Sequence, residues 1–193
     1  MVASRYDDEV WEQVPDDGGP APDHLARFVR SLDPVDSALD LGCGDGRLAG
    51  ELRALDLTLA DVSAVALERA ARRVPAATAV ELTPDAPLPF DDSSFDLVLC
   101  AETLEHVRDV QLLLSEVRRV LRPAGELALT TPAHGRATGL QIAAAGFERR
   151  FDPLSPHLRF LTRRSLRALL DGTGFDVRSL HRRRGTLLAT ATR

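Results

Sequence analysis

A glycine-rich segment with acidic flanks is the first feature of this chain that could do chemistry. Residues 39–46 read Leu-Asp-Leu-Gly-Cys-Gly-Asp-Gly and continue a short apolar run. Glycines allow the backbone to turn tightly and to approach a ligand closely, so the segment predicts a small-molecule site. The carboxylates of Asp40 and Asp45 flank the turn. They would repel a phosphate and attract a positively charged ligand.

The spacing of these glycines excludes the usual dinucleotide fingerprint. That fingerprint places its third glycine three positions after the second, where this chain has Arg47, and glycine falls at Gly46 instead. A ligand that carries a sulfonium and an ammonium group therefore fits the acidic turn better than a pyrophosphate does.

A further acidic residue, Asp61, ends the next apolar run, 19 residues beyond Gly42. In a nucleotide-binding α/β architecture, an acid at this place accepts hydrogen bonds from ribose hydroxyls. The neighbouring Val62 would then pack against an adenine ring. The alternative is that Asp61 only caps a helix that begins near Ser63.

Two carboxylates and an imidazole follow a later apolar run, in the order Glu102, Thr103, Leu104, Glu105, His106. On a helical turn, positions i, i+3 and i+4 share one face, which would bring the two glutamates and His106 together. Such a face can hold a divalent cation that lowers the pKa of an acceptor hydroxyl. Without a metal, His106 is either a general base or a hydrogen-bonded structural histidine.

The elements that must position these residues alternate short apolar runs with amphipathic segments. Strands are predicted near residues 38–41, 57–60, 78–82, 95–100 and 126–130, with helices at 47–54, 64–73 and 110–121. This alternation predicts a mostly parallel sheet that is covered on both faces. A later helix near 162–170 and adjacent strands at 176–180 and 186–192 predict an antiparallel edge.

The length of 193 residues fits a single domain. We place this domain at residues 37–193, after an N-terminal leader of residues 1–36 that packs on or covers the cleft. The leader contains Tyr6 and Trp11, which either close over a ligand or anchor the leader by packing. Residues 133–161 have weak periodicity, and so long a connection is typical of a substrate-facing insertion.

Charge and composition predict a cytoplasmic protein that does not contact membranes. The net charge is −5, and no apolar run approaches the length of a membrane span. Cys43 and Cys100 lie in apolar segments, which suits reduced, partly buried thiols. The acidic balance disfavours nucleic acid as a partner, and we interpret the three arginines at 182–184 as a solvated strand edge.

Four segments in this order and spacing resemble the class I S-adenosylmethionine-dependent methyltransferases, over roughly residue 38 to the C-terminus. They are LDLGCGDG, Asp61, LPFDDSSFDLVL and RVLRPAGELALTTP. The resemblance implies a Rossmann-like, doubly wound α/β fold with a seven-stranded, mostly parallel sheet and an antiparallel last strand. It also implies S-adenosyl-L-methionine as the cofactor.

The resemblance assigns roles to individual residues. Asp40, Gly42, Cys43 and Gly44 form the loop around the methionine moiety, Asp61 and Val62 hold the ribose and adenine, and Ala101 and Glu102 line the cofactor cleft. The acid that recognises the adenine is expected at Asp85, with Glu81 as the substitute.

The Glu-x-x-Glu-His pattern resembles the metal site of ubiquinone-biosynthesis O-methyltransferases and of small-RNA 2′-O-methyltransferases. That resemblance implies Mg²⁺ or a similar ion at Glu102, Glu105 and His106. A further histidine ligand would be His157, with His134 as the second choice.

These observations predict an enzyme that methylates a small molecule, and oxygen is the expected acceptor atom. The first alternative is a metal-assisted RNA 2′-O-methyltransferase, which the acidic charge and the lack of an added RNA-binding module disfavour. The second is a regulatory subunit that binds the cofactor without turnover, because the same glycine loop permits it.

Overall fold

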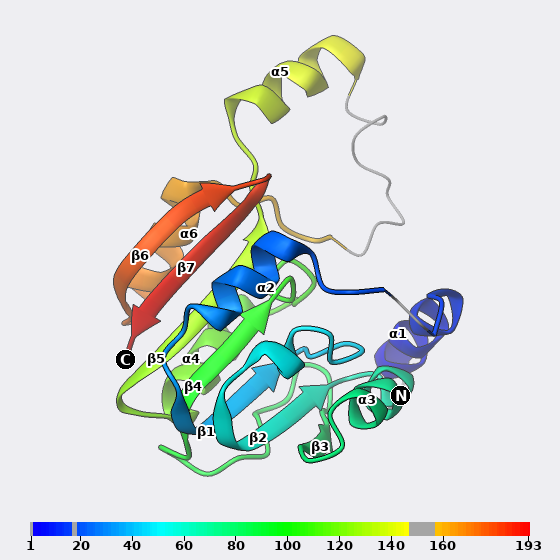
Figure 1. The fold of residues 1–193 in the computed structure, drawn as a ribbon. Helices are drawn as coiled ribbons and strands as arrows, with labels where there is room; N and C mark the ends of the chain where they lie inside the picture. Colours follow the sequence, from blue (N-terminus) through cyan, green and yellow to red (C-terminus); the bar gives the residue numbers. More distant parts are fainter. Residues whose placement is uncertain (1, 17–18, 147–156) are drawn as a thin grey trace.

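The computed structural model describes residues 2–16, 19–146 and 157–193, and a seven-stranded sheet forms the centre of this part of the chain (Figure 1). The strands lie in the order β3-β2-β1-β4-β5-β7-β6. Their bounds are β1 Val35–Leu41, β2 Ala54–Asp61, β3 Thr78–Glu81, β4 Phe95–Ala101, β5 Leu121–Pro132, β6 Asp176–Arg183 and β7 Thr186–Thr192. All neighbouring strands run parallel except β7, which is antiparallel to both β5 and β6. The predicted Rossmann-like fold class is therefore confirmed.

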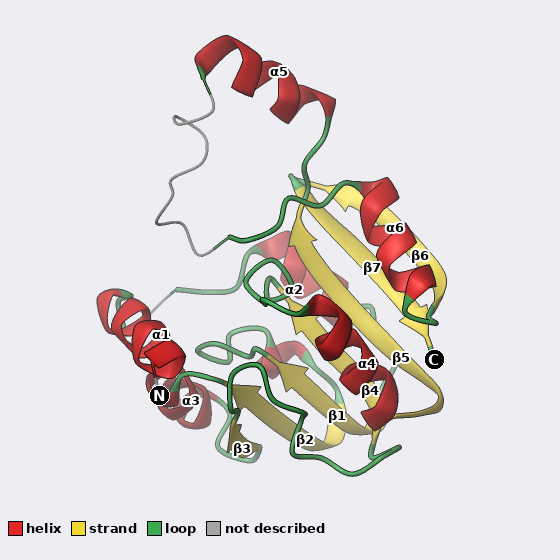
Figure 2. Cartoon of the chain, turned by 180° about the vertical axis from the view of Figure 1, so that it is seen from behind, coloured by secondary structure: helices red, strands yellow, loops and turns green. Residues whose placement is uncertain are grey.

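Helices cover both faces of the sheet (Figure 2). Their bounds are α1 Val2–Gln13, α2 Asp23–Arg30, α3 Ala64–Arg73, α4 Val110–Val120, α5 Arg136–Ala145 and α6 Arg163–Gly172. Helices α4 and α6 pack on one face, and α2 packs on the other face with α3 beside it. In contrast, α5 stands away from the sheet at one end of the molecule (Figure 1).

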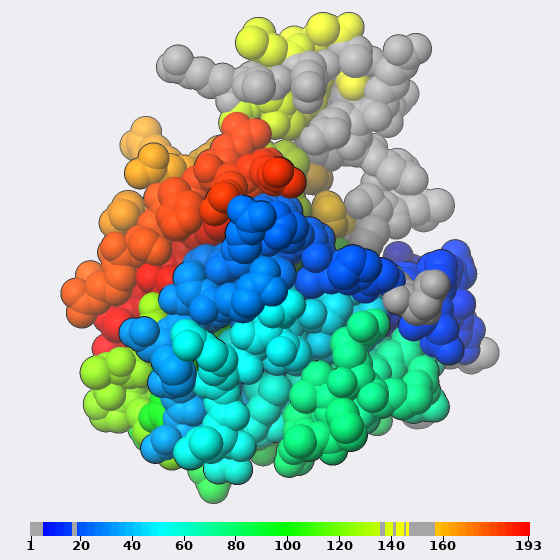
Figure 3. Space-filling model, in the orientation of Figure 1, coloured from blue at the N-terminus to red at the C-terminus, as the bar shows by residue number. Residues whose placement is uncertain are grey.

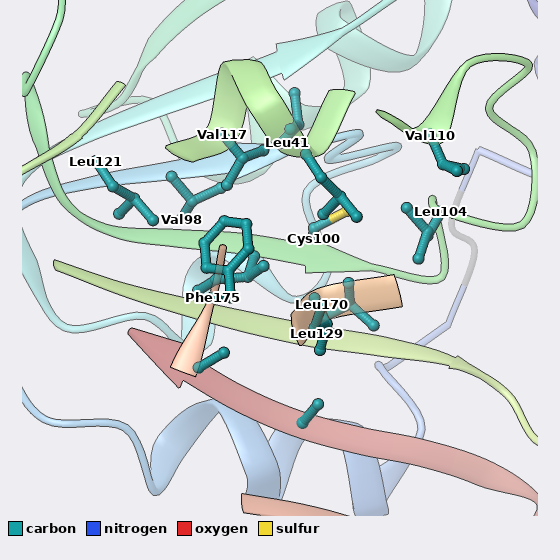
Figure 4. Close-up of a cluster of buried hydrophobic side chains, with 14 of the residues drawn as sticks. Leu41, Val98, Cys100, Leu104, Val110, Val117, Leu121, Leu129, Leu170 and Phe175 are labelled. Carbon is teal, nitrogen blue, oxygen red and sulfur yellow. The ribbon is translucent and has the colours of Figure 1, made fainter. Parts of the chain in front are cut away.

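The middle of the central strand β4, residues 97–100, is apolar without interruption because both of its faces are buried. Successive side chains of a strand point to opposite faces, so Leu97 and Leu99 face α2 while Val98 and Cys100 face α4. The close-up of the α4 side shows Val98 and Cys100 packed beside Val117 (Figure 4). This core fixes the carboxyl ends of β1, β2 and β4 at one edge of the sheet.

The helix predicted at residues 47–54 is wrong. The chain after β1 forms turns and one short 3₁₀ helix, η1 at Ala49–Glu51, before β2 begins. Gly46, directly before this segment, has a φ of +75°, and Gly50 within it is a poor helix former. After the short 3₁₀ turn, Leu52 already has an extended backbone with φ −73° and ψ 143°, so the glycine loop leads directly into a short connection.

Candidate functional site

A cavity of about 800 Å³ lies at the carboxyl ends of β1, β2 and β4. Ligand sites of open α/β sheets form at this edge, where neighbouring strands connect to opposite faces. The cavity is lined by parts of α1, the glycine loop, the loop after β3 and the loop after β4; the acidic lining residues are Asp7, Asp61, Asp85, Glu102, Asp109 and Glu116. The cavity therefore presents carboxylates from several separate segments to a bound ligand.

The glycine loop makes two close approaches that a side chain would block. Gly42 and Gly44 have φ angles of +71° and +53°, which L-residues rarely adopt. A Cβ atom on Gly42 would lie 2.4 Å from the side chain of Thr103, and one on Gly44 would lie 2.7 Å from the ring of Trp11. The loop is thus packed between the loop after β4 and helix α1.

Asp61 holds the glycine loop through main-chain hydrogen bonds. One oxygen of its carboxylate accepts a bond of 2.8 Å from the Gly44 nitrogen, and the other accepts a bond of 3.0 Å from the Ser63 nitrogen. The side chain that caps α3 is Ser63, which accepts from the nitrogen of Ala66. Asp61 lies at the cavity wall and is 8% exposed, and burial raises its pKa.

Asp40 lies beneath the same loop with one oxygen that lacks a hydrogen-bond partner among the described residues. The side chain is 2% exposed. Burial, with a further contribution from the charge of Asp61, raises the pKa of Asp40 to about 7. A positive charge above the loop would favour the ionised form of this carboxyl, whereas a phosphate would oppose it.

The other expected cofactor residues take different positions. Val62 and Asp85 line the cavity, and Asp85 makes an ion pair of 3.2 Å with Arg108. The Cys43 side chain is buried among Leu59 and its neighbours, so only its backbone belongs to the loop. Two further expected residues lie outside the cavity wall: Ala101 packs on the α2 side of the core, and Glu81 is exposed at the end of β3.

The loop after β4 begins with a strained glutamate. Glu102 has a φ of +53°, and one of its carboxylate oxygens accepts a hydrogen bond of 2.8 Å from the hydroxyl of Thr130 on β5. Burial, then the charge of Glu105, raises the pKa of Glu102 to about 7. Strained residues with perturbed pKa values are common at functional sites.

Glu105, His106 and His157 form a group whose potential ligand atoms lie within 4.8 Å of one another. Glu105 is 1% exposed and accepts a hydrogen bond of 3.0 Å from the Thr131 hydroxyl, while its other oxygen lies 3.9 Å from Nε2 of His106. Glu102, which bonds to Thr130 instead, is not part of this group. The loop is a turn rather than a helix, so Glu102 and Glu105 bond to different threonines of β5.

Leu158 and Arg159, at the end of the expected 133–161 insertion, dock against this same loop. The nitrogen of Leu158 donates to the carbonyl of Glu105 at 2.8 Å, and Arg159 donates to the carbonyls of Val107 and Arg108. His134 lies against the ring of Phe160 rather than in the Glu105 group. Residues 147–156, within the expected insertion, are outside the described residues.

Helix α1 supplies residues that sequence reasoning missed. Asp8 accepts a hydrogen bond of 2.6 Å from the Ser63 hydroxyl and one of 3.3 Å from the Val65 nitrogen, so it binds α1 to the start of α3. Asp7 lines the cavity, and burial followed by the charge of Asp61 raises its pKa. No motif could have identified these acids, because the contacts join segments more than fifty residues apart.

Comparison with known proteins agrees with this geometry. The sequence family described as a methyltransferase domain matches residues 39–129, which include the glycine loop, Asp61 and the loop after β4. The match and the fold together identify residues 39–129 as part of a class I S-adenosylmethionine-dependent methyltransferase domain.

Among curated relatives of this methyltransferase domain, a ubiquinone biosynthesis O-methyltransferase of Xanthomonas oryzae pv. oryzae is 32% identical over 160 residues, covering 73% of this chain and 65% of the relative. A 27-O-demethylrifamycin SV methyltransferase of Amycolatopsis mediterranei is 35% identical over 115 residues, covering 55% and 42% respectively. The chain thus spans less than two thirds of the length of these relatives.

Solved structures share the fold of this domain. The [4+2]-cyclase SpnF aligns with a TM-score of 0.77 at 20% identity, covering 100% of this chain and 94% of the cyclase. At this identity the likeness concerns the fold alone.

In the part of the chain that the structure describes, every helix is too short or too polar to serve as a transmembrane segment.

Proposed function

We propose that this chain transfers a methyl group from S-adenosyl-L-methionine to an oxygen of a small molecule. The observation that carries the proposal is the cavity at the glycine loop, where buried Asp40 and cavity-lining Asp61 favour a positively charged ligand. Two relatives are named as O-methyltransferases of small molecules, which supports the acceptor class.

In this proposal the backbone of Gly42, Cys43 and Gly44 surrounds the methionine moiety, with the Asp40 carboxyl beneath the loop. Asp61 and Val62 face the ribose and adenine, and Asp85 is the acid that recognises the adenine edge. Ala101 and Glu102 mark the end of β4 beside the methyl group. Within the leader of residues 1–36, α1 covers the cleft while α2 packs on the sheet of the domain at 37–193, and residues 133–161 face the acceptor.

The chemical step asks little of the protein beyond placement. A sulfonium is a good leaving group, so the chain must align the acceptor oxygen with the methyl carbon and exclude water. When the acceptor is a hydroxyl, its proton must also be removed. His106 lines the cavity and is the residue that we assign as the base, or as a ligand of an ion that lowers the hydroxyl pKa.

The group of Glu105, His106 and His157 supports a metal as a second element of the proposal. One carboxylate and two imidazoles are typical ligands of Mn²⁺, Fe²⁺ or Zn²⁺, whereas Mg²⁺ prefers an all-oxygen set. The Glu105 oxygen that has no hydrogen-bond partner among the described residues is the atom nearest His106. A bound ion would supply a Lewis acid for the acceptor hydroxyl, with Glu105, His106 and His157 as its ligands.

Calorimetry and turnover test the proposal in order. The purified chain should bind S-adenosylmethionine and S-adenosylhomocysteine, and it should methylate members of a panel of phenols, carboxylic acids and sugars. Failure to bind either cofactor form, together with binding of NAD or ATP, would refute the proposal. Binding without turnover would favour the regulatory subunit, and methylation of RNA would favour the 2′-O-methyltransferase.

Two variants and a chelator distinguish the roles of the histidines. If a metal acts, His157→Ala and chelation should each reduce turnover by about tenfold or more, and Mn²⁺ should restore the chelated enzyme. If His106 is a metal-free base, His106→Ala should reduce turnover while chelation has no effect.

We also propose a cytoplasmic location, which suits the two buried free thiols, Cys43 and Cys100.

A further inference from the structure

Arginines are concentrated in one segment near the end of the chain. Residues 163–184 contain seven arginines and two aspartates, a formal charge of +5, while the whole chain carries −5 and the remaining residues therefore carry −10. All seven arginines are exposed. Among the described residues, Arg178 alone of the seven has an ion pair, with Asp176 at 3.2 Å.

The other six arginines form what we name the arginine patch. Three lie on α6 and three at the end of β6 and the following turn: Arg163, Arg164, Arg167, Arg182, Arg183 and Arg184. Both sets lie close to Ala133, which pairs with Leu161 just before α6 and donates a hydrogen bond to the carbonyl of Gly185 just after Arg184. The two sets thus share one end of the molecule, within the orange-to-red region at the upper left of Figure 3.

The fold places this patch at the edge of the sheet where the cavity opens. Both β5 and β6 are antiparallel to β7, so they run in the same direction and end at the same edge. Gly185, which follows the patch, accepts a hydrogen bond of 2.7 Å from the nitrogen of Ala133 just beyond β5. Three strand spacings separate β6 from β4, so the patch lies about 14 Å from the end of β4.

Protection of a sheet edge explains only half of this arrangement. Charged residues on an edge strand prevent pairing with another chain, which accounts for the three arginines on and after β6. It does not account for Arg163 and Arg164 in the first turn of α6, where no acidic residue occurs and the helix dipole disfavours positive charge. A surface that concentrates unpaired arginines against these tendencies is suited to an acidic partner.

We propose that the arginine patch docks a folded, strongly acidic carrier protein that delivers the methyl acceptor on a flexible arm. This inference rests on the proposed function and names how the acceptor arrives. The guanidinium group matches a carboxylate in a bidentate manner, and the separation from β4 requires an arm of about 14 Å or more.

Nucleic acid fits the same surface less well. The one Phe, Tyr or Trp of this segment, Phe175, is 3% exposed, and the exposed ring of His181 is the single imidazole there, so the segment lacks a row of aromatic rings on which successive bases could stack. The remaining residues carry −10, and a long polyanion would extend from the patch onto that negative surface. A compact protein with one acidic face can contact the patch alone.

Charge reversal tests the proposal in the full chain, with a holo-acyl carrier protein as the acidic probe. Variant Arg163→Glu/Arg164→Glu places acids where the dipole of α6 favours them, so folding should be preserved. Variant Arg182→Glu/Arg184→Glu reverses the β6 end. The matched control, Arg27→Glu/Arg30→Glu on α2, makes the same change in net charge and removes two exposed ion pairs.

Each patch variant should weaken carrier binding by about tenfold or more, and the control by less than about twofold, at low ionic strength. With an acceptor loaded on the carrier, the KM should rise while kcat stays unchanged. The proposal is overturned if the carrier protein does not bind, if the control variant weakens binding equally, or if a single-stranded RNA binds more tightly through the same arginines.

Failure of this inference is distinguishable from failure of the proposed function. Both patch variants should bind S-adenosylmethionine and methylate a free small acceptor as the unsubstituted chain does, because the patch lies outside the cavity wall. If the unsubstituted chain binds the carrier but methylates no acceptor, free or carried, the proposed function fails while the docking surface stands.

Discussion

Two loops with acidic neighbours lie at the carboxyl ends of the neighbouring strands β1 and β4, and the carboxylates at each loop are held by different means. Asp61, at the end of β2 beside the glycine loop, accepts main-chain hydrogen bonds from Gly44 and Ser63. Glu102 and Glu105 in the loop after β4 accept side-chain hydrogen bonds from two threonine hydroxyls of β5. The first loop is thus held through its main-chain nitrogens, whereas the second is held through the side-chain hydroxyls of two threonines.

The largest expected effect comes from blocking the first loop. Gly42→Ala combines a φ of +71° with a Cβ atom 2.4 Å from the side chain of Thr103. We expect the free energy of unfolding to fall by about 2 to 3 kcal/mol and the affinity for S-adenosylmethionine to fall by about a hundredfold. Denaturant titration and calorimetry measure the two quantities.

Gly50→Ala is the matched control, because a Cβ atom there would meet no atom within 4 Å and its φ is not positive. It should leave cofactor affinity and stability close to those of the unsubstituted chain. Normal cofactor binding by Gly42→Ala would show that the glycine loop is not preorganised, and the contrast between the two loops would be lost.

The next effect concerns the buried acid of the first loop. In the native state Asp40 has a pKa of about 7, above its ordinary value of 3.8. The native state therefore retains a proton that the unfolded chain releases, and the free energy of unfolding falls as pH rises from about 4 to about 7. Asp40→Asn should remove this loss, so its gain in stability is near zero at pH 4 and reaches about 2 to 4 kcal/mol at pH 8.

The same substitution should reduce affinity for S-adenosylmethionine by about tenfold, because the amide carries no charge to balance the sulfonium. Thermal unfolding at several pH values and calorimetry at pH 8 measure both effects. Asp56→Asn, at an exposed position of β2, serves as the control and should change neither. Equal stabilisation of Asp40→Asn at pH 4 and pH 8 would contradict the assigned cause.

A smaller effect is expected in the second loop. Thr131→Val removes the hydroxyl that donates to the buried Glu105 carboxylate. Leaving this acceptor less satisfied should reduce the free energy of unfolding by about 1 to 3 kcal/mol. Thr131→Ser keeps the hydroxyl and should retain most of the stability, as measured by denaturant titration. If the valine and serine variants unfold alike, the hydrogen bond does not hold this loop.

The smallest effect concerns the cover over the first loop. Trp11 packs on Gly44, so Trp11→Ala should accelerate release of S-adenosylhomocysteine by about three- to tenfold while stability changes by about 1 kcal/mol or less. Stopped-flow fluorescence or competition kinetics would measure the release rate. The exposed neighbour on the same helix, Glu12→Ala, is the control. An unchanged release rate would indicate that Trp11 only anchors α1.

Local sequence rules succeeded where the capping residue and the apolar spacing of an element agree. The helix predicted at 64–73 has the bounds of α3, because Ser63 caps its start and its apolar residues recur at helical spacing. The helix predicted at 47–54 failed because Gly50 is a poor helix former and the backbone is extended again at Leu52, so an apolar pattern in eight residues was not enough.

Predictions of which side chains lie close together in the folded chain were less complete. The pattern of Glu102, Glu105 and His106 suggested one helical face, but two hydroxyls from β5 bind the glutamates separately. His157 was expected near Glu105 from resemblance, and the structure does place the two together. Asp7 and Asp8 of α1 belong to no motif, and only packing brings them to the cavity and to α3.

The sequence by itself determined the strands, their alternation with helices and the glycine turn, because short apolar runs and glycines act through neighbours along the chain. The tertiary structure alone decided which carboxylates are buried and which hydroxyl or main-chain group donates a hydrogen bond to each one. It also decided that the arginines of α6 and β6 lie at the same edge of the sheet as the cavity. Those properties depend on desolvation and on distances between segments that are remote in sequence, and no local pattern encodes either.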